Sequence, residues 1–234
     1  MVASNEYDTN QHTAKRSYPI SFAGDHVRLA GQIDYPAQPA PVSGYPLIFV
    51  IQHATSTSRD SYQYVVRIGA ESNMAVFRWD KRGTGKSASG GNGSVMVDAI
   101  HAYQTALSQA DIDRNQIIIL AQLEGTLLLN EAFDDFRAIQ APRGVILTGN
   151  MLDEKAILTL DVPVHILLSK NDWNDWHIYA ESAAKSHATH YGISPSYYVA
   201  PNTDRKLKYT NTSTFHRGAE DSIKDWLKQL CQIS

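Results

Sequence analysis

Short apolar runs alternate with amphipathic stretches along most of the chain. The runs at residues 47–51, 74–77, 117–120, 145–147 and 164–168 are continuously apolar apart from one histidine, and a weaker run follows at 197–199. Short runs of this kind are typical of strands buried on both faces of a sheet. The stretches at residues 95–110, 126–139, 176–188 and 215–230 have helical periodicity. The pattern therefore predicts strands and helices in alternation.

The first part of the chain has a different pattern. Residues 19–22 and 27–33 form two strand-like segments, the second alternating apolar and polar side chains, around a turn at residues 23–25. This arrangement predicts an N-terminal antiparallel β-hairpin. A hairpin followed by alternating strands and helices favours an α/β fold of three layers, with a mostly parallel sheet covered by helices on both faces. In such sheets ligands bind beyond the carboxyl ends of the strands.

The chain of 234 residues is long enough for one α/β domain, and no Gly/Ser/Pro-rich or charged linker divides it. Residues 1–17 are polar and lack the apolar core of a secretory signal, so we expect a disordered arm there and a single domain over residues 18–234. The loop at residues 149–161 is too short to hold a large lid domain.

Charge and cysteine content exclude several classes of partner. A net charge of −3 and a pI near 6.3 give no basic patch for nucleic acid, and no apolar run reaches the roughly 18 residues that a membrane span needs. The single cysteine, Cys231, fits a reducing compartment, and we expect a cytoplasmic protein. His187 and His190 share a predicted helix face, but no carboxylates accompany them. We interpret this pair as a solvated face and predict neither a metal site nor a cofactor.

The most informative motif is at residues 121–125, between a predicted buried strand and the start of a helix. A nucleophile elbow, G-x-S-x-G, is expected in this setting. The closing glycine is present as Gly125, and the small residue Ala121 replaces the opening one. The nucleophile position itself holds Leu123, which can neither attack a carbonyl group nor be activated by a base.

A second motif, D-x-R-G-x-G-x-S, begins at Asp80 and contains Arg82, Gly83 and Gly85. With the elbow and the order of elements, it resembles the α/β-hydrolase fold superfamily, and more narrowly the small single-domain serine hydrolases of the dienelactone-hydrolase and acyl-peptidase-like type. The resemblance covers nearly the whole chain from about residue 18. It implies that these four residues are scaffold that supports the active-site face.

The resemblance also implies an oxyanion loop after the strand at residues 47–51. His53 and Ala54 match the histidine and the first glycine of the H-G-x-G motif, and Thr55 would supply one backbone N–H group. The backbone N–H of Glu124, the residue after the nucleophile position, would supply the other. His53 is either a structural hydrogen-bonding residue or a base. Glu124 is either a first-turn acidic residue favoured by the helix dipole or an acid/base group.

The remaining triad positions follow the last two strands. Asp172 matches the acid, with Asp175 as a fallback. Arg205 occupies the histidine position in a P-G-x-D-H-like segment, and an arginine stays protonated and cannot act as a general base. We expect Asp172 and Arg205 to form an ion pair instead of a relay. His216, at the start of the last helix, is the alternative to the missing histidine.

Three functional hypotheses remain, and the first is the one we favour. It is a degenerate hydrolase-fold protein without hydrolytic activity, a pseudoenzyme that binds a small, anionic molecule or a protein partner. The second is a repurposed enzyme, such as a lyase, isomerase, cyclase or cofactor-free oxidative enzyme, that uses Glu124, His53 or Asp172 as its acid/base group. The third is a hydrolase whose catalytic residues lie elsewhere. The oligomeric state is left open.

Overall fold

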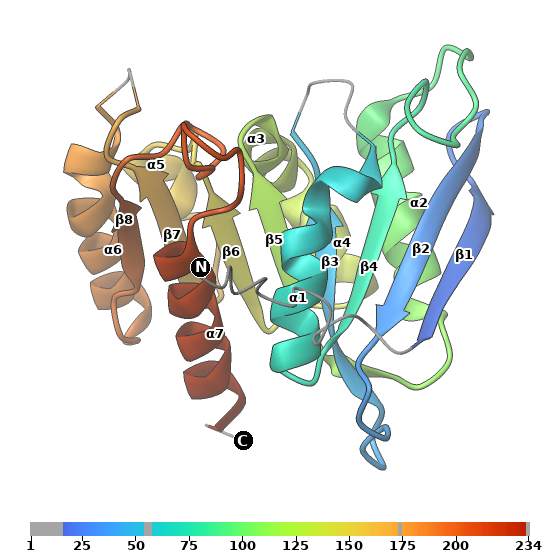
Figure 1. Ribbon diagram of the computed structural model, residues 1–234, viewed down its shortest axis with the longest axis horizontal. Helices are drawn as coiled ribbons and strands as arrows, with labels where there is room; N and C mark the ends of the chain where they lie inside the picture. Colours follow the sequence, from blue (N-terminus) through green and yellow to red (C-terminus); the bar gives the residue numbers. More distant parts are fainter. Residues whose placement is uncertain (1–15, 54–57, 173–174, 233–234) are drawn as a thin grey trace, which may run out of the picture.

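An eight-stranded sheet runs through the molecule in the order β1-β2-β4-β3-β5-β6-β7-β8 (Figure 1). The structure is a computed structural model, and it describes residues 16–53, 58–172 and 175–232. The strands are β1 (Arg16–Ala23), β2 (Arg28–Tyr35), β3 (Tyr45–Ile51), β4 (Ala75–Asp80), β5 (Ile112–Gln122), β6 (Gly144–Thr148), β7 (Val164–Ser169) and β8 (Tyr197–Ala200).

The predicted N-terminal hairpin is confirmed. β1 and β2 pair antiparallel, with Ile20 opposite Gly31, and β2 also pairs antiparallel with β4. Every other pair, from β4–β3 across to β7–β8, is parallel. β1 begins at Arg16, so the described sheet starts slightly before the domain boundary expected at residue 18.

Helices cover both faces of the sheet, as the alternation of elements predicted. Because successive side chains of a strand point to opposite faces, β3 contributes Phe49 to one core and Val50 to the other. The helices are α1 (Gln63–Glu71), α2 (Val95–Leu107), α3 (Glu124–Glu131), α4 (Phe133–Ile139), α5 (Glu154–Ile157), α6 (His177–Tyr191) and α7 (Arg217–Gln232), with a 3-10 turn, η1 (Arg59–Tyr62). Figure 1 shows α1 and α7 in front of the sheet, and α2 and α4 behind it.

Several features differ from the pattern predicted from the sequence. The predicted helix over residues 126–139 is two helices, α3 and α4, which meet at Ala132. The β4 strand continues beyond Phe77 through Asp80, although it then includes a charged residue, Arg78. Arg78 is tolerated there because its Nη2 and Nε atoms donate to Asp34 at 2.7 and 3.0 Å, pairing the buried charge.

A further difference is α1, which, like the short helix α5, was not predicted from the sequence. Its buried side chains are Tyr64, Val65, Val66 and Ile68, and they pack into the same core as α7. The helix is short and follows the polar residues after β3 directly, so its apolar spacing is hard to distinguish from that of a loop.

In the described part of the chain, the helices are too short or too polar to cross a membrane. Within the same residues, no group of three or more His, Cys, Asp or Glu side chains gathers where an ion would bind.

The interpretation of His187 as solvated is wrong, because this side chain is buried and its Nε2 atom lies 2.7 Å from the Leu160 carbonyl oxygen. His190, one helical turn on, is exposed.

Candidate functional site

The turn between β5 and α3 has the backbone of a nucleophile elbow. Leu123 lies at φ 50° and ψ −121°, a conformation that glycine adopts readily and a branched side chain avoids. Its carbonyl oxygen accepts hydrogen bonds from the backbone N–H and the hydroxyl of Thr126, at 2.8 and 2.6 Å. The sharp turn predicted at residues 121–125 is therefore present.

The two small residues of the elbow are needed for tight packing. Ala121 is fully buried in β5, next to β3. A Cβ atom on Gly125 would lie 2.7 Å from the Ile51 carbonyl oxygen and 2.8 Å from that of Gln52. Only a residue without a side chain lets α3 approach the end of β3 this closely.

The Leu123 side chain is buried. It is 6% exposed, and a Cβ atom on Gly149 would lie 2.8 Å from its Cδ2 atom and 2.4 Å from the Arg205 carbonyl oxygen. The leucine is therefore packed against the loop after β6 and close to the segment that carries Arg205. The nucleophile position is filled by hydrocarbon.

The predicted ion pair between Asp172 and Arg205 is confirmed. The Arg205 Nε atom donates to Asp172 Oδ2 at 3.4 Å, with the aspartate side chain 3% and the arginine side chain 28% exposed. Asp175, the fallback acid, is exposed. Asn202 has φ 55°, which fits its place at the glycine of the P-G-x-D-H-like segment.

His216 is engaged elsewhere. Its Nδ1 atom accepts a hydrogen bond from the backbone N–H of Ala219 at 3.2 Å, and its ring lies between those of Tyr198 and Tyr209. Burial lowers the pKa of its imidazole. These contacts place His216 as a cap at the start of α7, and a relay to Leu123 finds no support among them.

His53 lies at the end of β3 and is buried. Its backbone N–H donates to the Tyr62 hydroxyl at 3.0 Å, and its carbonyl oxygen accepts a hydrogen bond from the Lys81 ammonium. Burial, with the nearby positive charges of Lys206 and Lys81, lowers the pKa of the imidazole to about 4. The ring is therefore neutral at pH 7 and a weaker base than an ordinary histidine. Ala54 and Thr55 lie outside the described residues, so the oxyanion loop stays a prediction.

The turn after β4 has the contacts expected of a scaffold. The Asp80 carboxylate accepts the backbone N–H groups of Arg59 and Lys86 at 2.7 and 2.9 Å, and it pairs with the Arg59 guanidinium. Gly83 and Gly85 both have positive φ, and a Cβ atom on Gly85 would collide with the Asp80 carboxylate. A side chain at Gly85 would thus displace the group that ties β4 to the loop after β3.

Arg82 connects the same turn to α2. Its Nε and Nη2 atoms donate to the two carboxylate oxygens of Asp98 at 2.7 and 2.9 Å. The Asp98 side chain is completely buried, and this bidentate pair raises the pKa of the guanidinium. The bond fixes the start of α2 beside the carboxyl ends of β3 and β4.

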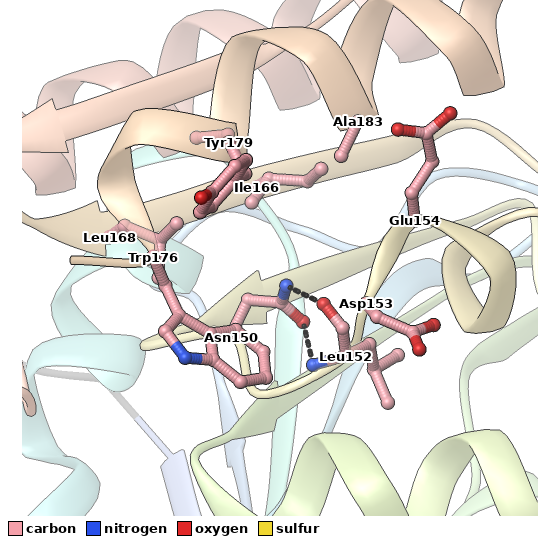
Figure 2. Close-up of a pocket in the computed structure, with 10 residues that line it drawn as sticks. Asn150, Leu152, Asp153, Glu154, Ile166, Leu168, Trp176, Tyr179 and Ala183 are labelled. Atoms are coloured by element: carbon pink, nitrogen blue, oxygen red, sulfur yellow. Dashed lines mark hydrogen bonds between the residues drawn. The ribbon is translucent and has the colours of Figure 1, made fainter. Parts of the chain in front are cut away.

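Two cavities lie at the carboxyl edge of the sheet, and one of them is lined by Glu124 of the elbow. The first, which we call the Trp176 cavity, has a volume of about 280 Å³ and lies between α6 and the loop after β6 (Figure 2). Its walls are mostly apolar, and its buried amide, Asn150, already exchanges two hydrogen bonds with the backbone of Leu152, at 2.8 and 3.0 Å. The cavity is lined by Asn150, Leu152, Asp153, Glu154, Ile166, Leu168, Trp176, Tyr179, Ala180 and Ala183.

The second, which we call the Gln52 cavity, has a volume of about 370 Å³ and lies at the carboxyl ends of β3 and β4, next to the start of α3. It is lined by Gln52, Lys81, Arg82, Gly83, Thr84, Val95, Glu124 and Leu128. Of the acid/base candidates, Glu124 therefore faces a cavity. Gln52 and Lys81 were not singled out in the sequence, although each directly follows a buried strand at the edge where ligands bind.

Comparison with known proteins agrees with this geometry. No protein-family model matches the sequence, and no curated protein sequence matches it. Solved structures do match: Est1E of Butyrivibrio proteoclasticus with ferulic acid bound has a TM-score of 0.68 at 15% identity, over 91% of this chain and 99% of that one. A dienelactone hydrolase-like promiscuous phosphotriesterase from metagenomic libraries has 0.66 at 12% identity, over 93% and 98%.

A lid-less α/β serine hydrolase of Xanthomonas campestris is also similar, with a TM-score of 0.61 at 14% identity over 93% of this chain and 94% of that one. The matches extend over nearly the full length of each partner, so the likeness involves the whole domain. The chain has the α/β-hydrolase fold in its small form without a large lid, as the sequence motifs indicated.

Proposed function

We propose that this protein is a non-hydrolytic member of the α/β-hydrolase fold that binds a small molecule at the carboxyl edge of its sheet. The observation that carries the proposal is Leu123, held in the strained elbow conformation with its side chain packed. The elbow geometry serves to present a nucleophile. Here the geometry is retained, and the side chain it presents has no lone pair or proton to use.

The other triad position supports the same conclusion. Arg205 is paired with Asp172, and a guanidinium remains protonated throughout the physiological range. In a well-studied serine protease, removal of the serine or the histidine alone costs about a million-fold in turnover. A chain that lacks both retains at most the weak acceleration that binding and oriented N–H groups provide.

Small-molecule binding is supported by the cavities at the carboxyl edge of the sheet and by the fold. The Gln52 cavity falls within the ordinary size range of ligand pockets, about 300–1,000 Å³. Est1E, which has the same fold, holds ferulic acid in its solved structure. We infer that this chain has kept the binding capacity of the fold and dispensed with the covalent step.

A repurposed enzyme is the second candidate, and Glu124 is the observation in its favour. This carboxylate lines the Gln52 cavity and could move a proton on a bound molecule. His53 is less suited, because a pKa of about 4 makes it a weak base. Native mass spectrometry of the purified protein with its bound ligand separates the two candidates. A ligand whose mass stays unchanged favours binding alone. A ligand that the wild-type protein converts over time, and that the Glu124→Gln variant does not convert, favours catalysis.

Restoration of the triad tests the proposal. The double variant Leu123→Ser with Arg205→His places a hydroxyl, an imidazole and Asp172 at the three triad positions. We expect weak nitrophenyl-ester hydrolysis from this variant, and none above background from Leu123→Ser alone, since its hydroxyl has an arginine where the base belongs. Leu123→Ala with Arg205→His is the matched control, because it differs from the double variant by one oxygen atom.

Hydrolysis by wild type at the rate of the double variant would contradict the proposal. Activity in Leu123→Ser alone would mean that another base is already within reach. If the double variant stays silent while circular dichroism shows an intact fold, the pocket itself has diverged from that of a hydrolase.

A further inference from the structure

The Gln52 cavity has a polar group that the protein leaves unused. The Gln52 side chain is buried, with the residue 3% exposed, and neither its Nε2 nor its Oε1 atom has a hydrogen-bond partner among the described residues. A buried amide without partners costs free energy, and native proteins rarely keep one without a reason. The NH2 group and the carbonyl oxygen of this amide thus both lack a protein partner at a wall of the cavity.

Two basic residues line the same cavity. The Lys81 ammonium is held in place by the His53 carbonyl oxygen, one of the three bonds it can donate. Arg82 is fixed by Asp98 through Nε and Nη2, whereas its Nη1 atom is buried and has no partner within the described chain. Together with Gln52 Nε2, these groups form a set of N–H donors around one space.

Such a donor set is suited to an anion. Burial lowers the pKa of Lys81 and the nearby Glu124 carboxylate raises it, so a bound negative charge would further favour the ammonium form. A carboxylate accepts several N–H bonds at once and fits both the Lys81 and the Arg82 groups. The remaining acceptor, Gln52 Oε1, requires a donor on the ligand, such as a hydroxyl group.

From this arrangement we propose that the Gln52 cavity binds a small hydroxycarboxylate. Its carboxylate lies against the Lys81 ammonium and the free N–H groups of Gln52 and Arg82, and its hydroxyl donates to Gln52 Oε1. The volume of about 370 Å³ is large enough to admit a molecule of the size of lactate or a hydroxybenzoate. The proposal rests on the proposed function, because it names the ligand class for a protein that binds rather than hydrolyses.

The Trp176 cavity is a poorer candidate for the same ligand. It is smaller, at about 280 Å³, and its lining is mainly apolar. Both polar atoms of the Asn150 amide are already engaged by the backbone of Leu152. Among the described residues that line it, none is a cation and none has a buried polar atom without a partner.

The test measures binding of lactate, 3-hydroxybutyrate and 3-hydroxybenzoate by isothermal titration calorimetry. Neutral 3-hydroxybenzyl alcohol, which replaces the carboxylate by an alcohol, controls for charge. We expect at least one hydroxycarboxylate to bind wild type. We expect 3-hydroxybenzyl alcohol to bind at least about tenfold more weakly than 3-hydroxybenzoate, because the charge-assisted hydrogen bonds of the carboxylate are lost.

Variants locate the site. Lys81→Met and Gln52→Met should each weaken binding about tenfold or more, because each removes donors that the ligand uses. Lys86→Met, at an exposed lysine of the same turn, is the matched control and should bind as wild type does. Gln52→Met should also raise the thermal midpoint of the free protein, because an apolar chain of similar length replaces an unsatisfied amide.

The proposal is overturned if none of the three acids binds, if the neutral alcohol binds as tightly as 3-hydroxybenzoate, or if Lys81→Met binds as tightly as Lys86→Met. The lysine pair keeps the test decisive even if Gln52→Met fails to fold. None of these results concerns hydrolysis. Failure of the ligand assignment is therefore distinguishable from failure of the non-hydrolytic proposal, which depends on the reactivity of residue 123.

Discussion

Substitution of Leu123 by alanine and by glycine separates two energies that coexist at this position. The leucine contributes buried hydrocarbon, and its backbone at φ 50° and ψ −121° is strained for any residue with a Cβ atom. Alanine removes the hydrocarbon and keeps the strain, whereas glycine removes both. The difference in stability between the two variants therefore measures the relieved strain minus the extra backbone entropy that glycine loses on folding.

The magnitudes follow from the structure. Loss of a buried leucine to alanine costs about 2–5 kcal/mol. Glycine adds roughly 1 kcal/mol for backbone entropy and returns about 1–3 kcal/mol of relieved strain. We therefore expect Leu123→Gly to be no less stable than Leu123→Ala, and up to about 2 kcal/mol more stable.

Leu129 is the matched control. Like Leu123 it is buried, but it lies inside α3, where glycine is worse than alanine by about 0.5–1 kcal/mol. Urea unfolding of the four variants gives the free energies of unfolding, provided that the m values agree. If glycine is the more destabilising residue at position 123 by as much as at position 129, the elbow stores no strain and the reasoning is refuted.

Two further outcomes are expected. Arg205→Ala should lower the free energy of unfolding by about 2–3 kcal/mol. This value lies between those for an exposed and a buried ion pair, because Asp172 is buried and the Arg205 side chain is 28% exposed. A loss below about 0.5 kcal/mol, measured by urea unfolding, would mean that the pair is dispensable. Burial lowers the pKa of His165 from 6.5 to about 3, so stability should be complete above pH 6.5 and fall below it as the unfolded state takes up the proton. His165→Gln should reduce that slope by up to about 1.4 kcal/mol per pH unit, and an unchanged slope would contradict the shift.

Much of the fold could be predicted from the sequence because its signals are local. The continuous apolar run at residues 47–51 predicts a strand buried on both faces, and the structure has such a strand there. What failed was the treatment of residues whose partners are distant in sequence. Arg78 continues β4 only because Asp34 lies on the neighbouring strand, and no local pattern reveals that pairing.

The same distinction applies to the candidate site, where residues in motifs were predicted and residues brought together only by packing were not. The elbow and the Asp172–Arg205 pair followed from motif positions, because each motif residue occupies a fixed place at the end of a strand. Gln52 and Lys81 have no motif of their own, and their importance arises only where β3, β4 and α3 meet around a cavity. A buried amide without a partner is a property of packing, which a sequence does not display.

Reaction with a fluorophosphonate probe, followed by intact-protein mass spectrometry, tests the central claim most directly. The probe forms a covalent bond with an activated serine, and the Leu123→Ser, Arg205→His variant serves as the positive control. We predict that the wild-type mass is unchanged after the probe has labelled the control, because an apolar side chain occupies the elbow. Stoichiometric labelling of any serine in the wild-type protein would contradict the account and identify a nucleophile elsewhere in the chain.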